Sequence, residues 1–492
     1  MGPDVPAPGG RRLDRLPFAR KLGYAAGALL DGIGQQAVAI FLFFYVTAVC
    51  GLPAALAGTA VAVGLVVDAV VDPLIGSASD ACGSRIGRRL PFMLVGLPGT
   101  MAFLVLIFSL PAGLSTGALF AWLTLCSIGL RVSISLFLLP FNAVGAELSD
   151  DYVERSSIAA WRWAFAMLGA LVAVVMGFGV FLGGPGGLAR RAAYTPFAAT
   201  LAAVAAVGAG FAIRTLAATR DRQFPAPPPG ADAMHRRLWR ELGEVFRNRS
   251  FRVLFVGALL LFTSLAIHAT LGLHANTYFW RMTPGQIQLV TLSLFGGLLC
   301  GAPLAGPFLK RMEKRNVLLI GMVGLAVAFG APASLRLAGA FPFAGERLAM
   351  TLGATVFVGG MLMAAAAIAF ASMMADAADE HEHLFGARRE GLYFAGWAFA
   401  SKAASGLGSL IAGVALQLVG FRSGTGGEAA AVSPDVVAWL GAIYGPGASL
   451  LAIASAAICL LYRLDARAHA LILADLAARR PTPAGGAREL HA

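Results

Sequence analysis

The sequence predicts an all-α membrane protein with twelve transmembrane helices, and two observations lead to this prediction. The first is composition: 58% of the 492 residues are hydrophobic and only 13% are charged, whereas soluble proteins average roughly 45–50% and 25%. The second is segment length, because a helix needs about 20 apolar residues to cross a bilayer. Apolar segments of sufficient length span residues 22–48, 54–78, 90–111, 117–146, 158–183, 193–217, 251–281, 285–309, 316–337, 346–375, 391–420 and 436–463. The lipid bilayer is therefore the expected environment of the chain.

The basic residues lie mainly on one side of these segments. The chain has 38 Lys and Arg residues and a net charge of +12. Most of the basic residues fall in the N-terminal tail, in the connections that follow the even-numbered segments, and in the C-terminal tail. Cytoplasmic loops carry such an excess, so both termini are predicted to be cytoplasmic. The basic character then reflects topology, and no nucleic-acid partner is expected.

The order of the segments indicates two halves. The one long polar interruption contains the proline-rich stretch PAPPPG at 225–230, which is typical of a linker. The tetrapeptide WAFA occurs at 163–166 and again at 397–400, and Arg155 and Arg389 precede the two copies by the same spacing. Parallel halves place a substrate site near the midplane between them. We predict an N-terminal six-helix half at 1–218, a cytoplasmic linker at 219–250, a C-terminal six-helix half at 251–464 and a cytoplasmic tail at 465–492.

Two acidic residues, Asp68 and Asp72, lie inside the second apolar segment. They are four residues apart, so on a helix they share one face. Like charges at this spacing repel each other unless something positive lies between them. A bound cation would meet that need, and so would Lys402 reaching across from the eleventh segment. Pro73 leaves the carbonyl of Ala69 without its helical partner, which adds a free oxygen near the two acids. The pair therefore predicts a cation site.

Other charges also fall inside the predicted spans. They are Asp31 in the first segment, Arg131 in the fourth, Arg162 in the fifth and Lys402 in the eleventh, and they have polar or aromatic neighbours in Gln35, Ser135 and Trp397. Each charge facing lipid would cost about 2.5–3.5 kcal/mol on insertion scales. Three acids balance three bases, so a polar central cavity is expected. Ion pairs that only lock helices together are the alternative. Arg131 could also lie nearer the outer mouth.

The second connection is predicted to be part of an inner gate. Gly76, Asp80, Arg88 and Arg89 lie in or beside this short cytoplasmic turn, where the charges could pair with neighbouring helix ends. A plain basic loop is the alternative. The run DEHEH at 379–383 is expected to be a cytoplasmic loop without a metal. The five cysteines have no paired spacing and predict neither a metal site nor a disulfide.

Several motifs resemble those of one transporter family. They are KLGYAAGALLD at 21–31, DAVVDPLIGSASD at 68–80, GRRLPFML at 87–94, PFNAVGAELSDDYVERSSIAAWRW at 140–163, and ADAADE followed by RREGLYFAGWAFASK at 375–402. The chain resembles the glycoside–pentoside–hexuronide:cation symporters of the major facilitator superfamily, the melibiose permease group. The resemblance covers most of the chain. It implies a twelve-helix fold that moves a sugar-like solute together with Na⁺ or H⁺ by alternating access.

The resemblance also implies roles for single residues. Asp31 and Arg162 would bind solute hydroxyls, while Asp68 and Asp72 would bind the cation with the Ser135 hydroxyl. Lys402 would link the two sites. The predicted solute-binding residues are Asp31, Gln35, Arg131, Arg162, Trp397 and Lys402. No cofactor and no metal are expected, other than a possible Na⁺ at the acidic pair.

One position departs from the family pattern. The melibiose branch has a further Asp on the fourth helix, where this chain has Leu138. A hard cation such as Na⁺ favours several oxygen ligands, whereas a proton needs only one carboxylate. The choice between H⁺ and Na⁺ is therefore open. Arg131, two turns away, could favour an anionic solute through a charge-assisted contact.

The predicted protein is thus a cation-coupled symporter of the cell inner membrane, acting as a monomer on a sugar, glycoside or uronide-like solute. A lysolipid or other lipid carrier on the same fold is one alternative, and an uncoupled efflux transporter is another. An enzyme is not expected, because the sequence has no nucleophile–base pair, no HExxH motif and no cofactor fingerprint.

Overall fold

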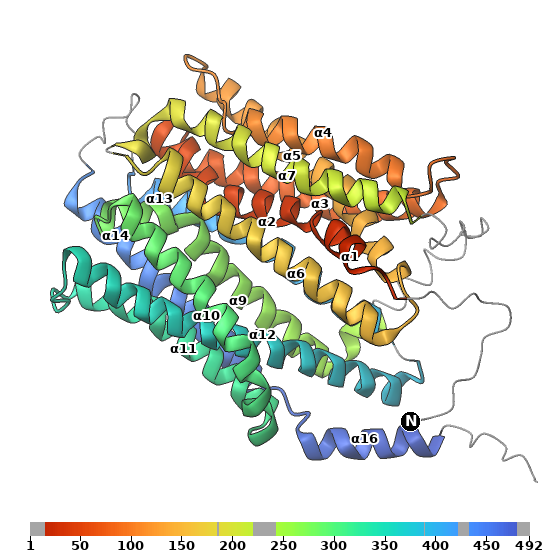
Figure 1. Ribbon diagram of the computed structural model, residues 1–492. Coiled ribbons are helices and arrows are strands. Elements are labelled where there is room, and N and C mark those ends of the chain that lie inside the picture. Colours follow the sequence, from red (N-terminus) through yellow and green to blue (C-terminus); the bar gives the residue numbers. More distant parts are fainter. Residues whose placement is uncertain (1–14, 185, 220–242, 388, 422–431, 480–492) are drawn as a thin grey trace, which may run out of the picture.

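The computed structural model describes residues 15–184, 186–219, 243–387, 389–421 and 432–479, and within these ranges it is helical and contains no strand. Twelve of its helices are long and apolar enough to cross a membrane. This confirms the predicted fold class. Figure 1 shows the helices in two groups, with α1–α7 in one half of the bundle and α9–α15 in the other.

The helices follow the predicted segments closely. The first half contains α1 Phe18–Ala25, α2 Ala28–Gln36, α3 Ala54–Ala81, α4 Leu90–Ile107, α5 Thr116–Glu147, α6 Tyr152–Val174 and α7 Tyr194–Ala217. The second half contains α9 Arg249–His274, α10 Pro284–Arg311, α11 Lys314–Leu337, α12 Gly345–Phe385, α13 Glu390–Leu418, α14 Pro434–Ala442 and α15 Ala448–Cys459. In the predicted tail, α16 covers Ala466–Arg479. The predicted linker lies mostly outside the described residues, so its boundaries stay a prediction.

Short π-helical stretches extend four of the spans. They are η1 Ala37–Leu42 and η2 Tyr45–Val49 in the first span, η3 Val175–Phe181 in the fifth, η7 Ala275–Phe279 in the seventh and η8 Ile443–Gly447 in the twelfth. Two 3₁₀ turns, η4 Gly187–Ala189 and η5 Arg191–Ala193, precede α7. Such π-helical turns often accompany functional sites. Here η2 and η7 belong to different halves, so the first and seventh spans are distorted in matching places.

Capping residues set several helix starts. Ser115, Asp151, Asn248 and Thr283 each accept a backbone N–H in the first turn of α5, α6, α9 and α10. Such caps satisfy donors that have no partner within the helix. These starts therefore lie close to the beginnings of the predicted spans.

One predicted element is wrong. The sequence predicts a cytoplasmic loop at 379–383, but α12 continues through this run to Phe385. The helix ends at Gly386, which adopts a φ of 76° that only glycine accepts without strain. A charged helix can extend past the membrane surface because water solvates it there. The hydrophobic pattern therefore marks the end of the span and not the end of the helix.

The two halves pack closely where α3 meets α13. A Cβ atom on Gly58 would lie 2.6 Å from the carbonyl oxygen of Ser409, and one on Gly413 would lie 2.4 Å from that of Ala54. Only glycine allows two helix backbones to approach this closely. These contacts lie at the start of α3 and the end of α13. We call this the closed end of the bundle.

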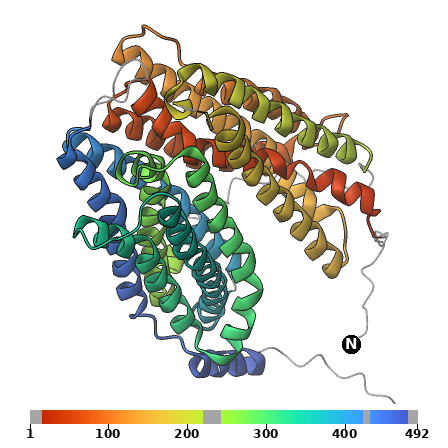
Figure 2. The same cartoon turned by 60° about the vertical axis from the view of Figure 1, so that its left-hand side comes forward.

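The opposite end carries the connections 82–89 and 148–151, together with Gly386 after α12, and we call it the basic end. Figure 2 shows that the halves lie together at the closed end and diverge toward the basic end. The helix α16 lies beside the basic end of the second half (Figure 1). The bundle is therefore asymmetric along its long axis.

Candidate functional site

The predicted cation pair is occupied by a lysine from the other half. The Lys402 ammonium on α13 donates to Asp68 Oδ2 at 2.9 Å and also to Asp72 Oδ2. The two carboxylates come from α3, so this ion pair joins the halves. Of the two possibilities that the sequence left open for the positive partner, the structure has the lysine. The ammonium group of Lys402 therefore lies at the position where the sequence predicts a bound, free cation.

The helix α5 adds Ser135 and Arg131 to this group of side chains. We call Asp68, Asp72, Lys402, Ser135 and Arg131 together the cation cluster. The Ser135 hydroxyl donates to Asp68 Oδ1 at 2.9 Å, and an Arg131 guanidinium nitrogen lies 4.0 Å from Asp68 Oδ2. The backbone of α3 leaves room for this arginine at Gly64, where a Cβ would lie 3.3 Å from the Arg131 side chain. The sequence placed Arg131 among the solute-binding residues or near the outer mouth. The structure brings it to the cation cluster instead.

The charges of the cluster balance, and its acidic side chains are largely buried. Asp68 is only 6% exposed, and its two carboxylate oxygens have partners in Ser135 and Lys402. Asp72 keeps one oxygen, Oδ1, that is buried and has no hydrogen-bond partner among the described residues. A buried acceptor without a partner costs about 1–3 kcal/mol. Asp72 therefore has a vacant acceptor that a proton or a metal ion can use.

A second group of polar side chains consists of Asp31, Gln35, Asn142 and Arg162, and we call it the solute cluster. Gln35 donates its side-chain amide to Asp31 Oδ1 at 2.8 Å, which fits their spacing of one helical turn. Arg162 on α6 donates to Asn142 Oδ1 at 3.0 Å. Arg162 is also close enough to Asp31 to interact electrostatically with its carboxylate, although no direct ion pair joins them in the described part of the chain. The sequence did not single out Asn142, which stands inside the PFNAVGAELSD motif.

One face of α5 connects the two clusters. Arg131, Ser135, Leu138 and Asn142 are spaced by four, three and four residues, so they lie along the same face. Ser135 contacts Asp68 and Asn142 contacts Arg162, about 10 Å apart along the helix at 1.5 Å per residue. Leu138 lies between the two on this face, where the melibiose branch has a carboxylate. A rigid helix face therefore links the cation cluster to the solute cluster, but without a shared acid.

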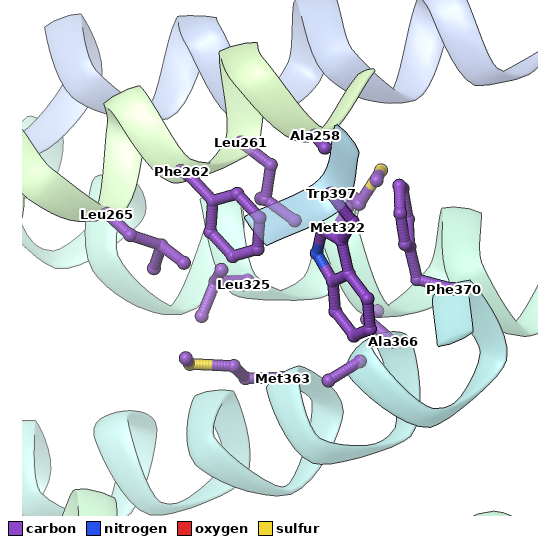
Figure 3. A pocket seen from close by; sticks show the side chains of 12 residues that line it. Ala258, Leu261, Phe262, Leu265, Met322, Leu325, Met363, Ala366, Phe370 and Trp397 are labelled. Atoms are coloured by element: carbon purple, nitrogen blue, oxygen red, sulfur yellow. The ribbon is translucent and has the colours of Figure 1, made fainter. Parts of the chain in front are cut away.

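Trp397 lies in neither cluster. It lines an apolar pocket inside the second half, between α9, α11 and α12, and Figure 3 shows it beside Phe370 and across from Phe262. The Trp397 and Phe370 ring centroids are 5.5 Å apart. The sequence predicted a solute contact for Trp397 alongside Asp31 and Arg162. The structure does not bring these residues together, because Trp397 projects into its own half while Lys402 projects toward α3.

The predicted gate residues are in part joined by ion pairs. Arg89 contacts Asp80 Oδ1 at 2.8 Å and Glu147 Oε1 at 3.0 Å, and Arg88 also pairs with Glu147 Oε1. Glu147 ends α5, so these bonds tie the second connection to α5 within the first half. A Cβ atom on Gly76 would meet no other part of the described structure within 4 Å, so this glycine is not required by packing there. The sequence did not single out Glu147, although it falls in the ELSDD stretch.

No group of three or more His, Cys, Asp or Glu side chains is arranged to hold a metal in the ranges that the structure describes. The five cysteines, including Cys50 and Cys459 in the core, are free thiols.

Comparison with known proteins gives the class of this chain. Residues 23–466 match the family model described as MFS/sugar transport protein. The match covers most of the chain, so the chain belongs to this family, the glycoside–pentoside–hexuronide:cation symporters of the major facilitator superfamily. The resemblance found in the sequence motifs is thereby confirmed.

Relatives and solved structures agree with this class. The chain is 25% identical to an uncharacterized symporter of Synechocystis sp., over 95% of this chain and 98% of the relative. It is 26% identical to an isoprimeverose transporter of Lactiplantibacillus pentosus, over 94% of this chain and 91% of the relative. A crystal structure of a D-xylose–proton symporter shares the fold, with a TM-score of 0.61 at 13% identity, covering 91% of this chain and 98% of that one.

The chain is therefore a cation-coupled symporter of sugar-like solutes and a multi-pass protein of the inner membrane, and it is not an enzyme.

Proposed function

We propose that this symporter couples solute entry to protons, and that Asp68 and Asp72 bind the proton when Lys402 withdraws. The observation that carries the proposal is the position of the Lys402 ammonium, which contacts both carboxylates. In this state the lysine acts as a built-in replacement for the coupling ion. The empty carrier can then change its conformation without leaving a bare charge in the membrane.

The charge balance supports the binding of one monovalent ion. With Lys402 in place, two carboxylates face two cationic side chains, Lys402 and Arg131, so the cluster is neutral. When the lysine leaves, the cluster keeps one net negative charge. One proton or one Na⁺ restores neutrality, and an uncompensated charge inside the membrane is costly. The stoichiometry that follows is one ion per solute.

The ligand set favours a proton over Na⁺. Na⁺ prefers several oxygen ligands, and Leu138 supplies none where a third acid stands in the melibiose branch. The Arg131 guanidinium lies 4.0 Å from Asp68 Oδ2 and would repel a metal ion bound beside it. A proton needs a single oxygen, and Asp72 Oδ1 is buried and has no hydrogen-bond partner within the ranges that the structure describes.

The solute is proposed to bind at the second cluster. Asp31 would accept hydrogen bonds from solute hydroxyls, and Arg162, held by Asn142, would donate to them. Gln35 is exposed and hydrogen-bonded to Asp31, so it can reach the same ligand. An array of charged acceptors and donors suits a polyol ring, because each hydroxyl both donates and accepts.

We also propose an orientation for the chain. The excess of basic residues at the basic end makes that end cytoplasmic, together with both termini. The structure is then an inward-facing state, since the halves meet at the opposite end and diverge toward the cytoplasm. Lys402 pairing with Asp68 and Asp72 fits this state, because the coupling ion has been released inward. A single chain carries both clusters, which supports a functional monomer.

The test is solute uptake into proteoliposomes driven by an imposed proton gradient or by an imposed Na⁺ gradient. We expect the proton gradient alone to drive accumulation. The variants Asp68→Asn and Asp72→Asn should abolish accumulation and leave solute exchange measurable. Accumulation driven only by Na⁺ would refute the choice of ion, and normal accumulation in both variants would refute the site.

The apolar pocket around Trp397 supports one second candidate, the carriage of a lysolipid. Its lining residues from α9, α11 and α12 are all apolar, which suits an acyl chain better than a sugar ring. Competition decides between the two: a lysolipid that blocks sugar uptake and is itself accumulated would favour the lipid carrier.

A further inference from the structure

We propose that His274 is a proton-binding gate at the closed end of the carrier. Its neutral imidazole holds the two halves together, and a proton taken from the outside releases them. The proposal rests on the orientation given above, which makes the closed end the outer end. It concerns a group separate from Asp68 and Asp72.

The gate is a single buried hydrogen bond between the halves. Thr47 lies in η2 of the first span and His274 ends α9 of the seventh span. The Thr47 hydroxyl oxygen and His274 Nε2 are 2.8 Å apart, and both residues are 0% exposed. A second polar contact between the halves lies nearby in sequence, where the amide of Ala55 donates to the side-chain oxygen of Gln417 at 3.0 Å. These bonds must break whenever the outer end opens.

The hydrogen-bond partners define the protonation state of His274. The Thr47 hydroxyl has one proton, and it donates that proton to the carbonyl oxygen of Phe43 at 2.6 Å. Its oxygen must therefore accept from His274, so Nε2 carries the hydrogen. His274 Nδ1 is buried and has no hydrogen-bond partner among the described residues. The closed state thus fits a neutral ring with a bare Nδ1.

The surroundings of His274 do not support a positive charge. Four aromatic rings enclose the imidazole at centroid distances of 5.0 to 6.4 Å, and they belong to Phe43, Phe44, Tyr278 and Phe421. Tyr278 is the one titratable group among them, and it is uncharged at neutral pH. No carboxylate contacts the ring in the described part of the chain. Arg281 follows Tyr278 in sequence, while Arg422 and Glu428, after Phe421, lie outside the described residues.

Protonation would therefore break the closed state. A second N–H at Nδ1 would point into the ring of aromatic side chains with no acceptor, and burying an unpaired charge costs several kcal/mol. When the halves separate, water reaches His274 and solvates the charged ring. The open state then binds a proton that the closed state excludes, so acid on the outer side favours opening.

The coupling between proton binding and opening determines how strongly pH changes the ratio of open to closed carrier. A hydrated imidazole has an ordinary pKa of about 6.5. If only the open state binds the proton, the ratio of open to closed carrier rises about tenfold between pH 7.5 and pH 5.5. For a carrier driven by protons, outer acidity would thus draw the empty molecule to the side where the proton and the solute are loaded.

Double electron–electron resonance can measure this ratio. Spin labels would be attached at Ala112→Cys and Ala340→Cys, which are exposed in connections at the closed end of the two halves. The accessible native thiols would be removed as Cys82→Ser and Cys300→Ser. Distances would be recorded at pH 7.5 and pH 5.5 in detergent without solute. We expect the long-distance population to rise about tenfold relative to the short one at the lower pH.

Two variants of the gate test the mechanism. His274→Asn keeps an N–H donor for Thr47 but cannot take a proton, so its distance distribution should not change with pH. Thr47→Val removes the acceptor, so the long distance should become more populated at both pH values. A pH response in His274→Asn equal to that of the parent protein would overturn the proposal, as would a parent response below twofold.

The same measurement in a background with Asp68→Asn and Asp72→Asn separates the two proposals. We expect the pH response to persist there, because His274 lies outside the cation cluster. Loss of the response in this background, with retention in His274→Asn, would assign pH sensing to the carboxylates and overturn the gate. Failure of proton-driven uptake with an intact pH response would instead refute only the proposed coupling ion.

Discussion

Replacing Lys402 by glutamine tests whether the positive charge of this side chain takes the place of the coupling ion in the empty carrier. Glutamine keeps a hydrogen-bond donor of similar reach but carries no charge. The substitution leaves Asp68 and Asp72 facing only Arg131, so the empty cluster has a net charge of −1. The ion-loaded cluster is neutral again. The variant should therefore impair the return of the empty carrier and spare the loaded carrier.

The free-energy cost of this substitution depends on how deeply the ion pair between Lys402 and the two carboxylates is buried. Removing one partner of a fully buried ion pair costs about 3–5 kcal/mol. The Lys402 side chain is 38% exposed, so solvent screens part of this cost and lowers it to about 2 kcal/mol. Since 1.4 kcal/mol corresponds to a factor of ten, return of the empty carrier should slow by roughly 30-fold.

Two transport assays separate the steps. Uphill uptake driven by a proton gradient requires the empty carrier to return, whereas solute counterflow does not. We expect uptake by Lys402→Gln to fall about 30-fold while counterflow stays within about threefold of the parent rate. Lys310→Gln is the matched control, because Lys310 is exposed at the end of α10 and belongs to neither cluster. Equal loss of uptake and counterflow, or loss of neither, would refute the reasoning.

Three further variants test the surrounding residues. Asn142→Ala should raise the KM for solute about tenfold by releasing Arg162, with little change in maximal rate, in uptake kinetics. Leu138→Asp should make uptake respond to Na⁺ at fixed pH, because it adds oxygen ligands between the clusters; no Na⁺ response would argue against this account of ion choice. Glu147→Gln should lower the free energy of unfolding by about 3 kcal/mol, because Arg88 and Arg89 lose a buried partner. An unchanged melting temperature would contradict this prediction.

The sequence was sufficient for the fold class because the membrane imposes a simple rule. Every spanning helix must present enough apolar residues to cross the hydrocarbon, so the twelve segments could be read directly from hydropathy. The same rule made the buried charges conspicuous. Asp68, Asp72 and Lys402 stood out because charged side chains inside a span are rare and costly.

This requirement for apolar residues applies only inside the membrane. Hydropathy therefore predicts helix ends and loops outside the membrane less well. The charged end of α12 looked like a loop because hydropathy carries no signal in water. Glu147 and Asn142 are not singled out by the sequence for a different reason. Each is an ordinary polar residue in the sequence, and its partner lies on another helix or loop.

The sequence by itself determined the twelve spans, the acidic pair on one helix face and the family, because these depend on composition, spacing and motif order. Only the tertiary structure decided which charges meet. It brought Lys402 to Asp68 and Asp72 over a separation of more than 300 residues, moved Arg131 from the solute cluster to the cation cluster, and paired Thr47 with His274 across the halves. These partners depend on how helices rotate and pack against one another, and no spacing along the chain records that.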